Sequence, residues 1–219
     1  MRTYFLIMVV AALATFFSTL ITLRISQRYK IFPQIRARDV HTTPTPRLGG
    51  IGMFVGFAVA LGVAATIGWF ESVFAAPEHI YAILAAAFLI TTIGILDDMV
   101  DLDWSLKLAG QFLAAGILAW QGVQIVSLPI AGITIGSFGT SFIVTVFLTV
   151  LVMNAVNFID GLDGLVAGVV AIGTIVFFTY SYILAQQTSP TNYFNLASLI
   201  SAIVIGVCLG FLPLNWHRA

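Results

Sequence analysis

The chain has 219 residues and a formal net charge of zero, with nine basic and nine acidic residues. Hydrophobic residues make up 60% of it and charged residues only 8%, whereas a soluble domain has about 25% charged residues. This composition excludes a soluble globular protein, and the lack of a basic domain argues against nucleic acid as a partner. We expect an integral membrane protein in contact with the lipid bilayer.

Apolar runs near the length needed to cross a bilayer, about 20 residues, recur along the chain. In order they are Tyr4–Leu23, Leu48–Phe70, Ile80–Leu96, Leu106–Trp120, Phe142–Met153 with its flanks, Leu165–Leu184 and Leu196–Leu214. The fourth is short and begins beside Lys107, so we expect one of its ends to be partly wet. The runs predict an all-α, polytopic transmembrane bundle of about seven spans, forming a single integral membrane domain over residues 1–219.

The distribution of Lys and Arg predicts the orientation of the bundle. Six of the nine basic residues lie between the first and second runs: Arg24, Arg28, Lys30, Arg36, Arg38 and Arg47. The positive-inside rule places this loop in the cytoplasm and the N-terminus outside. Counting spans forward, the loops at 97–103 and 160–163 are then also cytoplasmic. Seven of the nine acidic residues therefore share this face, which predicts a cytoplasmic site.

The segment Gly122–Thr140 has a different character from the apolar runs around it. Val123–Val126 and Ile133–Ile135 are rich in β-branched residues, with Pro129 and Gly132 between them. This pattern is typical of a small β-hairpin. By the same span count the hairpin is external, and we expect it to be a structural cover without chemistry.

The first loop on the predicted cytoplasmic face runs from His41 to Gly50, His-Thr-Thr-Pro-Thr-Pro-Arg-Leu-Gly-Gly. Its two prolines favour an extended backbone, and two glycines then open the second helix. A rigid turn feeding a helix N-terminus, with His41 and Arg47 nearby, suits a phosphate group. The alternative interpretation is an ordinary proline-capped entrance to a membrane helix.

The second loop contains Asp97 and Asp98, followed by Lys107 and Gln111. Adjacent carboxylates repel each other unless a cation or a shared proton is present. Mg²⁺ prefers oxygen ligands and usually keeps substrate phosphates as partners. The pair therefore predicts a metal or phosphoryl-transfer element with Lys107 as a phosphate contact, the alternative being a solvated helix cap. Two further acids in this loop, at 101 and 103, are interpreted as cap residues only.

The third loop carries two Asn and two Asp residues between two apolar runs: Asn154, Asn157, Asp160 and Asp163. Such side chains are costly in hydrocarbon and mark a membrane surface or a wet cavity. Gly161 and Gly164 permit a sharp bend or close approach to a ligand. We expect a polar site here rather than a simple tight loop.

Together the three loops resemble those of the polyprenyl-phosphate N-acetylhexosamine-1-phosphate transferases, which are multi-pass membrane enzymes with a cytoplasmic active site. The matching segments are His41–Gly50, Leu96–Asp98 with Lys107 and Gln111, and Asn154–Leu165. The Pro-Thr-Pro-Arg form is more similar to the branch that uses UDP-N-acetylglucosamine than to the branch that makes the first lipid intermediate of peptidoglycan. The resemblance also implies a bacterial inner membrane and a role in cell-envelope polysaccharide synthesis, such as that of lipopolysaccharide or teichoic acid.

The resemblance implies a reaction in which a polyprenyl phosphate attacks the β-phosphorus of a UDP-N-acetylhexosamine and UMP leaves. In such an enzyme Asp98 is a ligand of Mg²⁺ (Mn²⁺ being an alternative), Asp97 orients or activates the lipid phosphate, and Lys107 pairs with a phosphate. The positions that match the nucleoside pocket are Asn157, Asp160, Gly161, Leu162 and Asp163. His41 and Arg47 are expected either to contact substrate or to serve only as topology determinants.

The C-terminal part departs from the family pattern. In the family, a segment like Gly210–Asn215 leads to a Gly-Asp-x-Gly motif, whose Asp is a magnesium ligand, and later to a His/Arg-rich loop. This chain ends at Ala219, before both, so we expect it to be the N-terminal two-thirds of a larger domain. The alternatives are a non-catalytic membrane fragment or subunit, or a secondary transporter, whose site should lie near the bilayer midplane between repeats. The identity of the hexosamine and the oligomeric state, with a homodimer as one candidate, are left open.

Overall fold

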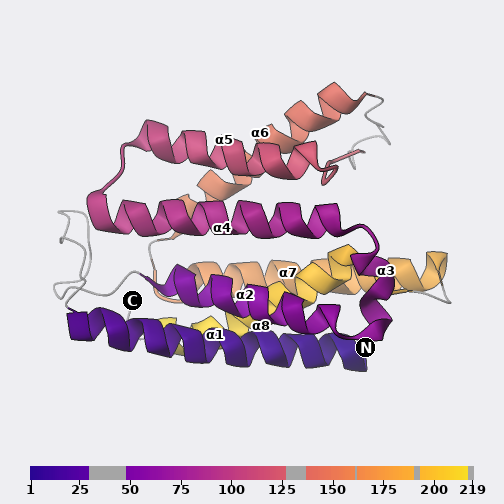
Figure 1. Ribbon diagram of the computed structural model, residues 1–219, viewed down its shortest axis with the longest axis horizontal. Helices are drawn as coiled ribbons and strands as arrows, with labels where there is room; N and C mark the ends of the chain where they lie inside the picture. Colours follow the sequence, from indigo (N-terminus) through magenta and orange to yellow (C-terminus); the bar gives the residue numbers. More distant parts are fainter. Residues whose placement is uncertain (30–47, 127–136, 161, 190–192, 217–219) are drawn as a thin grey trace. The chain divides into compact units, whose positions relative to one another are not determined.

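The computed structural model describes residues 1–29, 48–126, 137–160, 162–189 and 193–216, and no strand occurs among them. The elements, drawn in Figure 1, are α1 (Arg2–Tyr29), α2 (Gly49–Ala65), the 3₁₀ turn η1 (Gly68–Phe70), α3 (Glu71–Phe74), α4 (Pro77–Val100), α5 (Trp104–Trp120), α6 (Phe138–Ile159), α7 (Leu165–Thr188) and α8 (Leu196–Asn215). Each predicted apolar run coincides with a helix, which confirms the all-α class.

The number of spans differs from the seven that were predicted. Among the described helices, α1, α4, α6, α7 and α8 are long and apolar enough to cross a membrane, and α2 with the helical turns after it makes a sixth if that bent pair counts as one span. The second apolar run is continuous in hydropathy, but its helix stops at Ala65 and the chain bends by 94° into Gly68–Phe74. The fourth run forms a helix of only 17 residues.

The predicted external hairpin is not found in the part of Gly122–Thr140 that the structure describes. Val123–Val126 is not a strand. Instead, the Ile125 N–H donates to Thr145 Oγ1 (2.8 Å) and the Ile125 carbonyl accepts from Ser141 Oγ (2.6 Å). Hydroxyl groups of α6 thus satisfy the backbone groups that a partner strand would have paired. The second predicted arm, Ile133–Ile135, lies outside the described residues.

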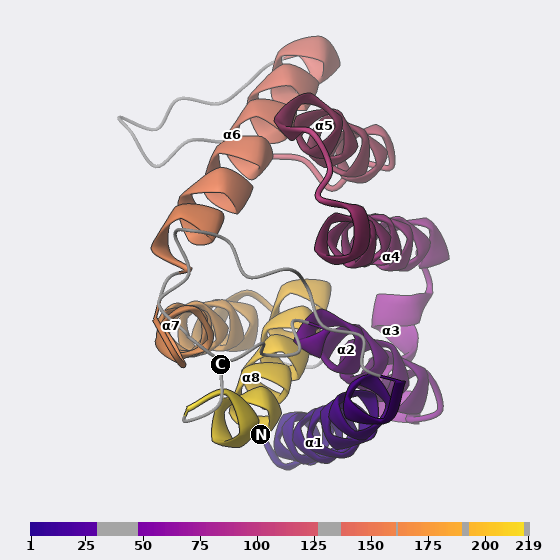
Figure 2. The ribbon, with the colours of Figure 1, turned by 90° about the vertical axis from the view of Figure 1, so that its left-hand side faces the viewer.

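Contacts divide the chain into two compact units, Met1–Ala75 with Gly161–Ala219 (unit 1) and Ala76–Asp160 (unit 2). In unit 1, α1 lies beside both α2 and α8 (Figures 1 and 2). The glycines of the two partner helices face α1 directly. A Cβ on Gly210 of α8 would lie 2.9 Å from Cα of Ala12, and one on Gly206 would lie 2.7 Å from Cβ of Ala11. The residue pairing shows that α1 and α8 run parallel.

The contact between α1 and α2 is equally close and runs antiparallel. Gly52 faces Thr19 and Gly56 faces Thr15, while Ser18 Oγ donates across the contact to the Gly52 carbonyl at 2.9 Å. Helices in a membrane gain little from the hydrophobic effect, so small residues that allow close backbone approach favour association. The two Thr side chains are buried, and their hydroxyl oxygens have no hydrogen-bond partner within the described part of the chain. Close packing, rather than hydrogen bonding, therefore holds these threonines in place.

The substitution Gly56→Ala is expected to destabilise this contact by about 1–3 kcal/mol, the usual cost of overpacking a well-filled interface. An added Cβ would lie 2.9 Å from Cα of Thr15 and closer still to its Oγ1, so the helices must separate. The thermal unfolding midpoint of the detergent-solubilised protein measures the effect. The control is Gly62→Ala on the same helix, where a Cβ meets nothing within 4 Å. Equal midpoints for the two variants would contradict the packing described here.

One end of unit 1 is closed by aromatic rings. Tyr4 packs edge-on against Phe70, Phe178 and Tyr182, and stacks on Phe194 with ring centroids 5.4 Å apart. The helix directions place the end of α1, the start of α7 and the end of α8 at the other end of the unit. A Cβ on Gly164, just before α7, would lie 3.4 Å from side-chain atoms at the end of α8. The turn before α7 and the basic end of α1 therefore share one end of unit 1.

Unit 2 consists of α4, α5 and α6, with α6 inclined to the other two in Figure 2. A short turn at 101–103 joins α4 to α5, and the two helices pack against each other. The middle of α5 meets the last part of α6 through Gln111 and Asn154, and just beyond its end α5 meets the first part of α6 through Ile125. The end of α4, the start of α5 and the end of α6 therefore lie at the same end of unit 2.

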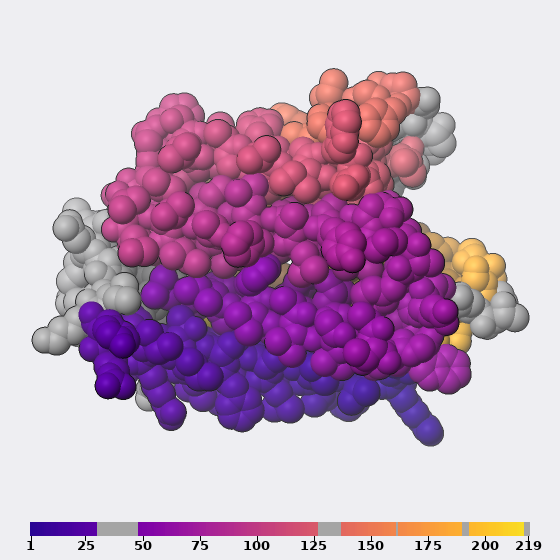
Figure 3. Space-filling model, in the orientation of Figure 1, coloured from indigo at the N-terminus to yellow at the C-terminus, as the bar shows by residue number. Residues whose placement is uncertain are grey.

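Much of the exposed surface of α1 is apolar. Exposed apolar side chains recur every four residues: Phe5, Val9, Leu13, Phe17, Ile21 and Ile25. Residues at this spacing are neighbours on the helix surface, so they form an apolar stripe that winds around α1, and α1, in indigo, is exposed in the face that Figure 3 shows. Such a surface suits contact with lipid rather than water, in agreement with the expected membrane location.

Candidate active site

The turn between α4 and α5 is built by two of its acidic residues. Asp101 adopts a left-handed conformation (φ 52°), which short polar side chains tolerate, and its N–H donates to the carbonyl of Asp97 at 2.9 Å. Asp103 caps α5 by accepting from the Ser105 N–H at 3.1 Å and from the Ser105 hydroxyl. These two hydrogen bonds hold the pKa of Asp103 below its ordinary value. Asp103 therefore serves the turn, as the sequence interpretation had it.

Asp97 and Lys107 form an ion pair across this turn. Lys107 Nζ lies 2.7 Å from Asp97 Oδ1, and the N–H of Leu102 donates to the same oxygen at 3.0 Å. The two side chains are 32% (Lys107) and 25% (Asp97) exposed, so each remains accessible to a ligand. Lys has three donors, of which this contact uses one. The pair can therefore hold its geometry while the ammonium group contacts a further anion.

Both charges of this pair stand at the unfavourable end of their helices. Asp97 lies in the last turn of α4, where the helix macrodipole favours cations, and Lys107 lies in the fourth position of α5, near the end that favours anions. Each placement works against its helix by about 0.3–1 kcal/mol. Helix stability alone would place these charges the other way round. A requirement other than helix stability, such as contact with a ligand, would account for the arrangement.

Asp98 follows Asp97 in the last turn of α4 and is partly buried. No group of three or more His, Cys, Asp or Glu side chains that could hold a metal occurs within the described ranges. Mg²⁺, however, is commonly bound by one or two carboxylates together with substrate phosphates. The carboxylate of Asp98, which follows the Asp97–Lys107 pair, fits that sparse donor set.

A hydrogen bond between Gln111 and Asn154 connects α5 to α6 at this same end of unit 2. Asn154 Nδ2 donates to Gln111 Oε1 at 2.6 Å and also to the Val150 carbonyl at 2.8 Å. Both residues lie in segments that resemble the transferase family, but no separate role was predicted for either. Their spacing could have marked them as neighbours of the site, since Gln111 lies one turn after Lys107 and Asn154 lies one turn before Asn157.

The predicted substrate-binding residues fall into three groups in the structure. Asn157 and Asp160 are exposed in the last turn and at the end of α6, three residues apart and so on one face. Leu162 and Asp163 belong to unit 1, in the turn before α7 that ends at Gly164 (φ 70°). Gly161, His41 and Arg47 lie outside the described residues, so their assignments stay predictions. The structure thus brings together Asp97, Asp98 and Lys107, and it places Asn157 and Asp160 at the same end of unit 2.

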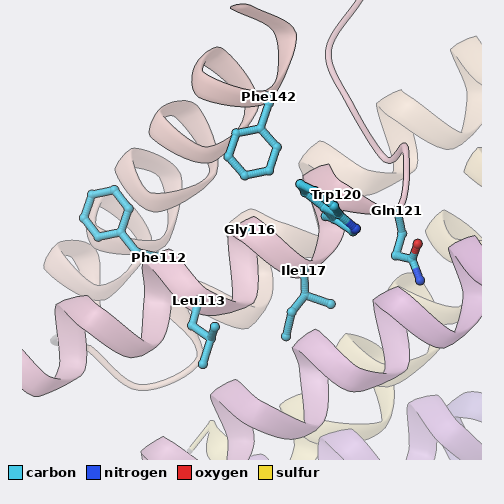
Figure 4. Close-up of a pocket in the computed structure, with 7 residues that line it drawn as sticks. All are labelled: Phe112, Leu113, Gly116, Ile117, Trp120, Gln121 and Phe142. Atoms are coloured by element: carbon cyan, nitrogen blue, oxygen red, sulfur yellow. The ribbon is translucent and has the colours of Figure 1, made fainter. Parts of the chain in front are cut away.

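A shallow groove of about 430 Å³ lies on α5 and α6, away from these charges. Figure 4 shows its lining: Phe112, Leu113, Gly116, Ile117, Trp120, Gln121 and Phe142. The lining is almost entirely apolar and extends toward the end of α5 that is remote from Lys107. Such a lining suits apolar groups rather than charged ones.

Comparison with known proteins identifies relatives of the chain. Residues 80–219 match the family model described as glycosyl transferase family 4. Over the whole chain, 36% of residues are identical to the decaprenyl-phosphate N-acetylglucosaminephosphotransferase of Mycobacterium leprae, of which 56% is covered. A Bacillus subtilis protein named "probable undecaprenyl-phosphate N-acetylglucosaminyl 1-phosphate transferase" is 32% identical over 96% of the chain and 55% of its own length.

A more distant relative is the phospho-N-acetylmuramoyl-pentapeptide-transferase of Desulforudis audaxviator, 29% identical over 83% of the chain and 58% of its own length. These matches confirm the resemblance drawn from the three loops, including the greater similarity to the N-acetylglucosamine branch. The chain spans about half the length of the curated relatives it matches.

Proposed function

Since the chain belongs to glycosyl transferase family 4, we propose that the protein containing it transfers N-acetylglucosamine 1-phosphate from UDP-N-acetylglucosamine to a polyprenyl phosphate, releasing UMP. The names of its relatives support the lipid acceptor and the sugar phosphate. Among the structural observations, the Asp97–Lys107 ion pair beside Asp98 carries the proposal. Together these three residues supply a cation and two carboxylates at one end of unit 2. Exposed amide and carboxylate groups of α6 lie at that same end.

The proposed reaction is a displacement at phosphorus. An oxygen of the polyprenyl phosphate forms a bond to the β-phosphorus, and the bond from that phosphorus to the bridging oxygen of UMP breaks, so UMP leaves with the electron pair. Such transfers depend mainly on positioning and on neutralising phosphate charge. Lys107 supplies one fixed positive charge, and Asp97 holds its ammonium group and orients the attacking phosphate. A phosphate already carries negative charge, so Asp97 need not remove a proton.

Asp98 is the residue that would hold a divalent cation, Mg²⁺ or Mn²⁺, in this scheme. When bound, the ion neutralises charge on the diphosphate and on the departing UMP. The chemistry of the donor set supports this role, because a carboxylate next to the Asp97–Lys107 pair suits a hard cation that takes its remaining ligands from phosphate oxygens and water.

Recognition of the UDP group is proposed for the polar residues at the end of α6 and the start of α7. Asn157 offers both a donor and an acceptor to a uracil edge, and Asp160 and Asp163 offer acceptors to ribose hydroxyls or the uracil N–H. Leu162 and Gly161 would lie against the base or allow close backbone approach, while His41 and Arg47 would contact phosphate.

The proposed location is a bacterial inner membrane, with the N-terminus outside and the site at the cytoplasmic face. The positive-inside rule supports this orientation. Within unit 1, the end of α1 that carries Arg24 and Arg28 is also the end where Asp163 precedes α7. Within unit 2, Asp97, Asp98, Asn157 and Asp160 lie at one end. This polarity within each unit supports a surface site rather than the midplane site of a transporter.

The test uses the protein expressed from its complete reading frame and reconstituted with undecaprenyl phosphate, UDP-N-acetylglucosamine and Mg²⁺. We expect UMP to appear in amounts equal to the lipid-linked sugar, and neither product when the lipid phosphate is omitted. UDP-N-acetylgalactosamine and UDP-N-acetylmuramoyl-pentapeptide serve as competing donors and should react more slowly. Folded protein that forms no UMP, or that moves sugar into vesicles without forming UMP, would refute the proposal.

A further inference from the structure

We propose that the hydrogen bond between Gln111 and Asn154 is a positioning link, which fixes the Asp97–Lys107 pair against the Asn157 face of α6. The inference rests on the proposed function and assigns a role in it to two residues that bind no substrate themselves. Gln111 would act through Lys107, and Asn154 through Asn157.

Helix geometry places the hydrogen bond close to both proposed substrate contacts. Gln111 lies four residues after Lys107 on α5, and Asn154 lies three residues before Asn157 on α6. Residues at these spacings are neighbours on the same helix face. The 2.6 Å bond therefore joins the two helices one turn away from each proposed substrate contact. A shift of either helix at this point would change the separation of the phosphate contact from the nucleoside contact.

The other end of the same helix pair is held separately. There Ile125, just after α5, is bonded through its backbone to Ser141 and Thr145 of α6. Because the pair is held both at Gln111, in the middle of α5, and at Ile125, pivoting of α5 on α6 is restricted. If the Gln111–Asn154 bond is lost, the Ile125 contacts remain as a pivot point, and the displacement grows toward the start of α5, where Lys107 lies. Apolar contacts between the helices are non-directional, so they restrict this displacement less than a hydrogen bond does.

The local contacts also fix which side chain donates. Asn154 Nδ2 faces both the Val150 carbonyl and Gln111 Oε1, so it gives one hydrogen to each acceptor. The reverse orientation would bring two oxygens together at Val150. Position 111 therefore requires an acceptor and position 154 requires a donor. A residue that only filled space would not show this asymmetry.

Substitutions at the two positions test the link through kcat. Gln111→Met keeps the side-chain length but removes the acceptor, and should lower kcat by about 10- to 100-fold, the scale expected for misplacement of reacting groups by about 1 Å. KM for both substrates should change by less than about threefold, since each contact survives separately. Asn154→Asp should give the same loss, because it removes the donor. Gln111→Glu keeps an acceptor at position 111, so its kcat should stay close to that of the parent protein.

Two comparisons separate positioning from general damage. Gln121→Met makes the same chemical change on the groove near the end of α5, and should leave kcat unaltered. The double variant Gln111→Met/Asn154→Leu should lose no more activity than Gln111→Met or Asn154→Leu alone, because the effects of removing two partners of one interaction are not additive. If the side chain at position 111 only filled space, Gln111→Glu and Gln111→Met would have similar kcat values. A much higher kcat in Gln111→Glu therefore supports the hydrogen bond.

A distance measurement tests the link without any activity. Spin labels at Leu106→Cys and Phe158→Cys, both exposed, report the separation of the start of α5 from the end of α6. The buried native Cys208 should remain unlabelled. We expect a narrow distance distribution that broadens in Gln111→Met and Asn154→Asp, and that stays narrow in Gln111→Glu and Gln121→Met.

These readouts keep the two proposals apart. A protein that forms no UMP would defeat the proposed function, while the distance distributions would still test the link. Unaltered kcat and an unaltered distribution in Gln111→Met would overturn the link. It would also be overturned if Gln111→Glu lost as much kcat as Gln111→Met, because the acceptor would then be irrelevant.

Discussion

Asp98→Asn in the complete protein is expected to lower kcat for UMP formation by about 100- to 1000-fold, the range seen when one charge-stabilising group is removed from an active site. The substitution keeps the shape of the side chain and removes its charge. A neutral carboxamide is a weaker ligand for a hard cation than a carboxylate. The Mg²⁺ concentration that gives half-maximal rate should therefore rise as kcat falls. A metal titration of the initial rate measures both effects.

The matched control is Asp103→Asn in the same loop. Asp103 caps α5 by accepting from the Ser105 N–H, and Asn is an equally good N-cap residue. This variant should keep both its rate and its dependence on Mg²⁺. If Asp98→Asn behaved like Asp103→Asn, the metal-ligand assignment would be wrong.

Lys107→Met is expected to lower kcat/KM by about 100-fold, because the fixed cation that faces the phosphate is lost. Asp97→Asn should also lower it, since the Lys107 ammonium group then loses the carboxylate that holds it at 2.7 Å. Steady-state rates at varied concentrations of both substrates measure these losses. Unchanged turnover in Asp97→Asn would remove Asp97 from the site.

The charge-swapped variant Asp97→Lys/Lys107→Asp separates function from stability. It keeps an ion pair across the turn and moves each charge to the helix end that favours it, a gain of about 0.3–1 kcal/mol per charge. This gain offsets the loss of the Leu102 N–H bond to Asp97 Oδ1, worth about 0.5–1.5 kcal/mol. We therefore expect an unfolding midpoint close to that of the parent protein, together with activity as low as in Lys107→Met. Activity restored by the swap would show that the pair only stabilises the turn.

The helices were predictable from the sequence, whereas the number of spans was not. Each apolar run becomes a helix because the backbone must satisfy its own hydrogen bonds in a bilayer. The run Leu48–Phe70 hides a break, because the residues between Ala65 and Gly68 do not lower its hydropathy, yet the chain bends there by 94°. The prediction of a hairpin was wrong because it, too, depended on a local pattern alone. The backbone at Ile125 is satisfied by hydroxyl groups 16 and 20 residues further along, which no local pattern indicates.

The candidate site was predictable in its residue types but not in its internal contacts. Two neighbouring Asp residues and a Lys ten residues later predicted a phosphate-handling element. Their pairing depends on the left-handed turn at Asp101, which brings the start of α5 back toward the end of α4. The contact between Gln111 and Asn154 joins residues 43 positions apart, so it required the packing of α5 on α6.

The most direct test of the proposed reaction follows the β-phosphorus of the donor. UDP-N-acetylglucosamine carrying radioactive phosphorus in the β position is incubated with the complete protein, polyprenyl phosphate and Mg²⁺, and the lipid and aqueous phases are then separated. Sugar-phosphate transfer predicts that the label enters the lipid phase in step with the formation of unlabelled UMP. Label released into the aqueous phase as UDP would show transfer of the sugar alone, and would contradict the proposed phosphoryl transfer.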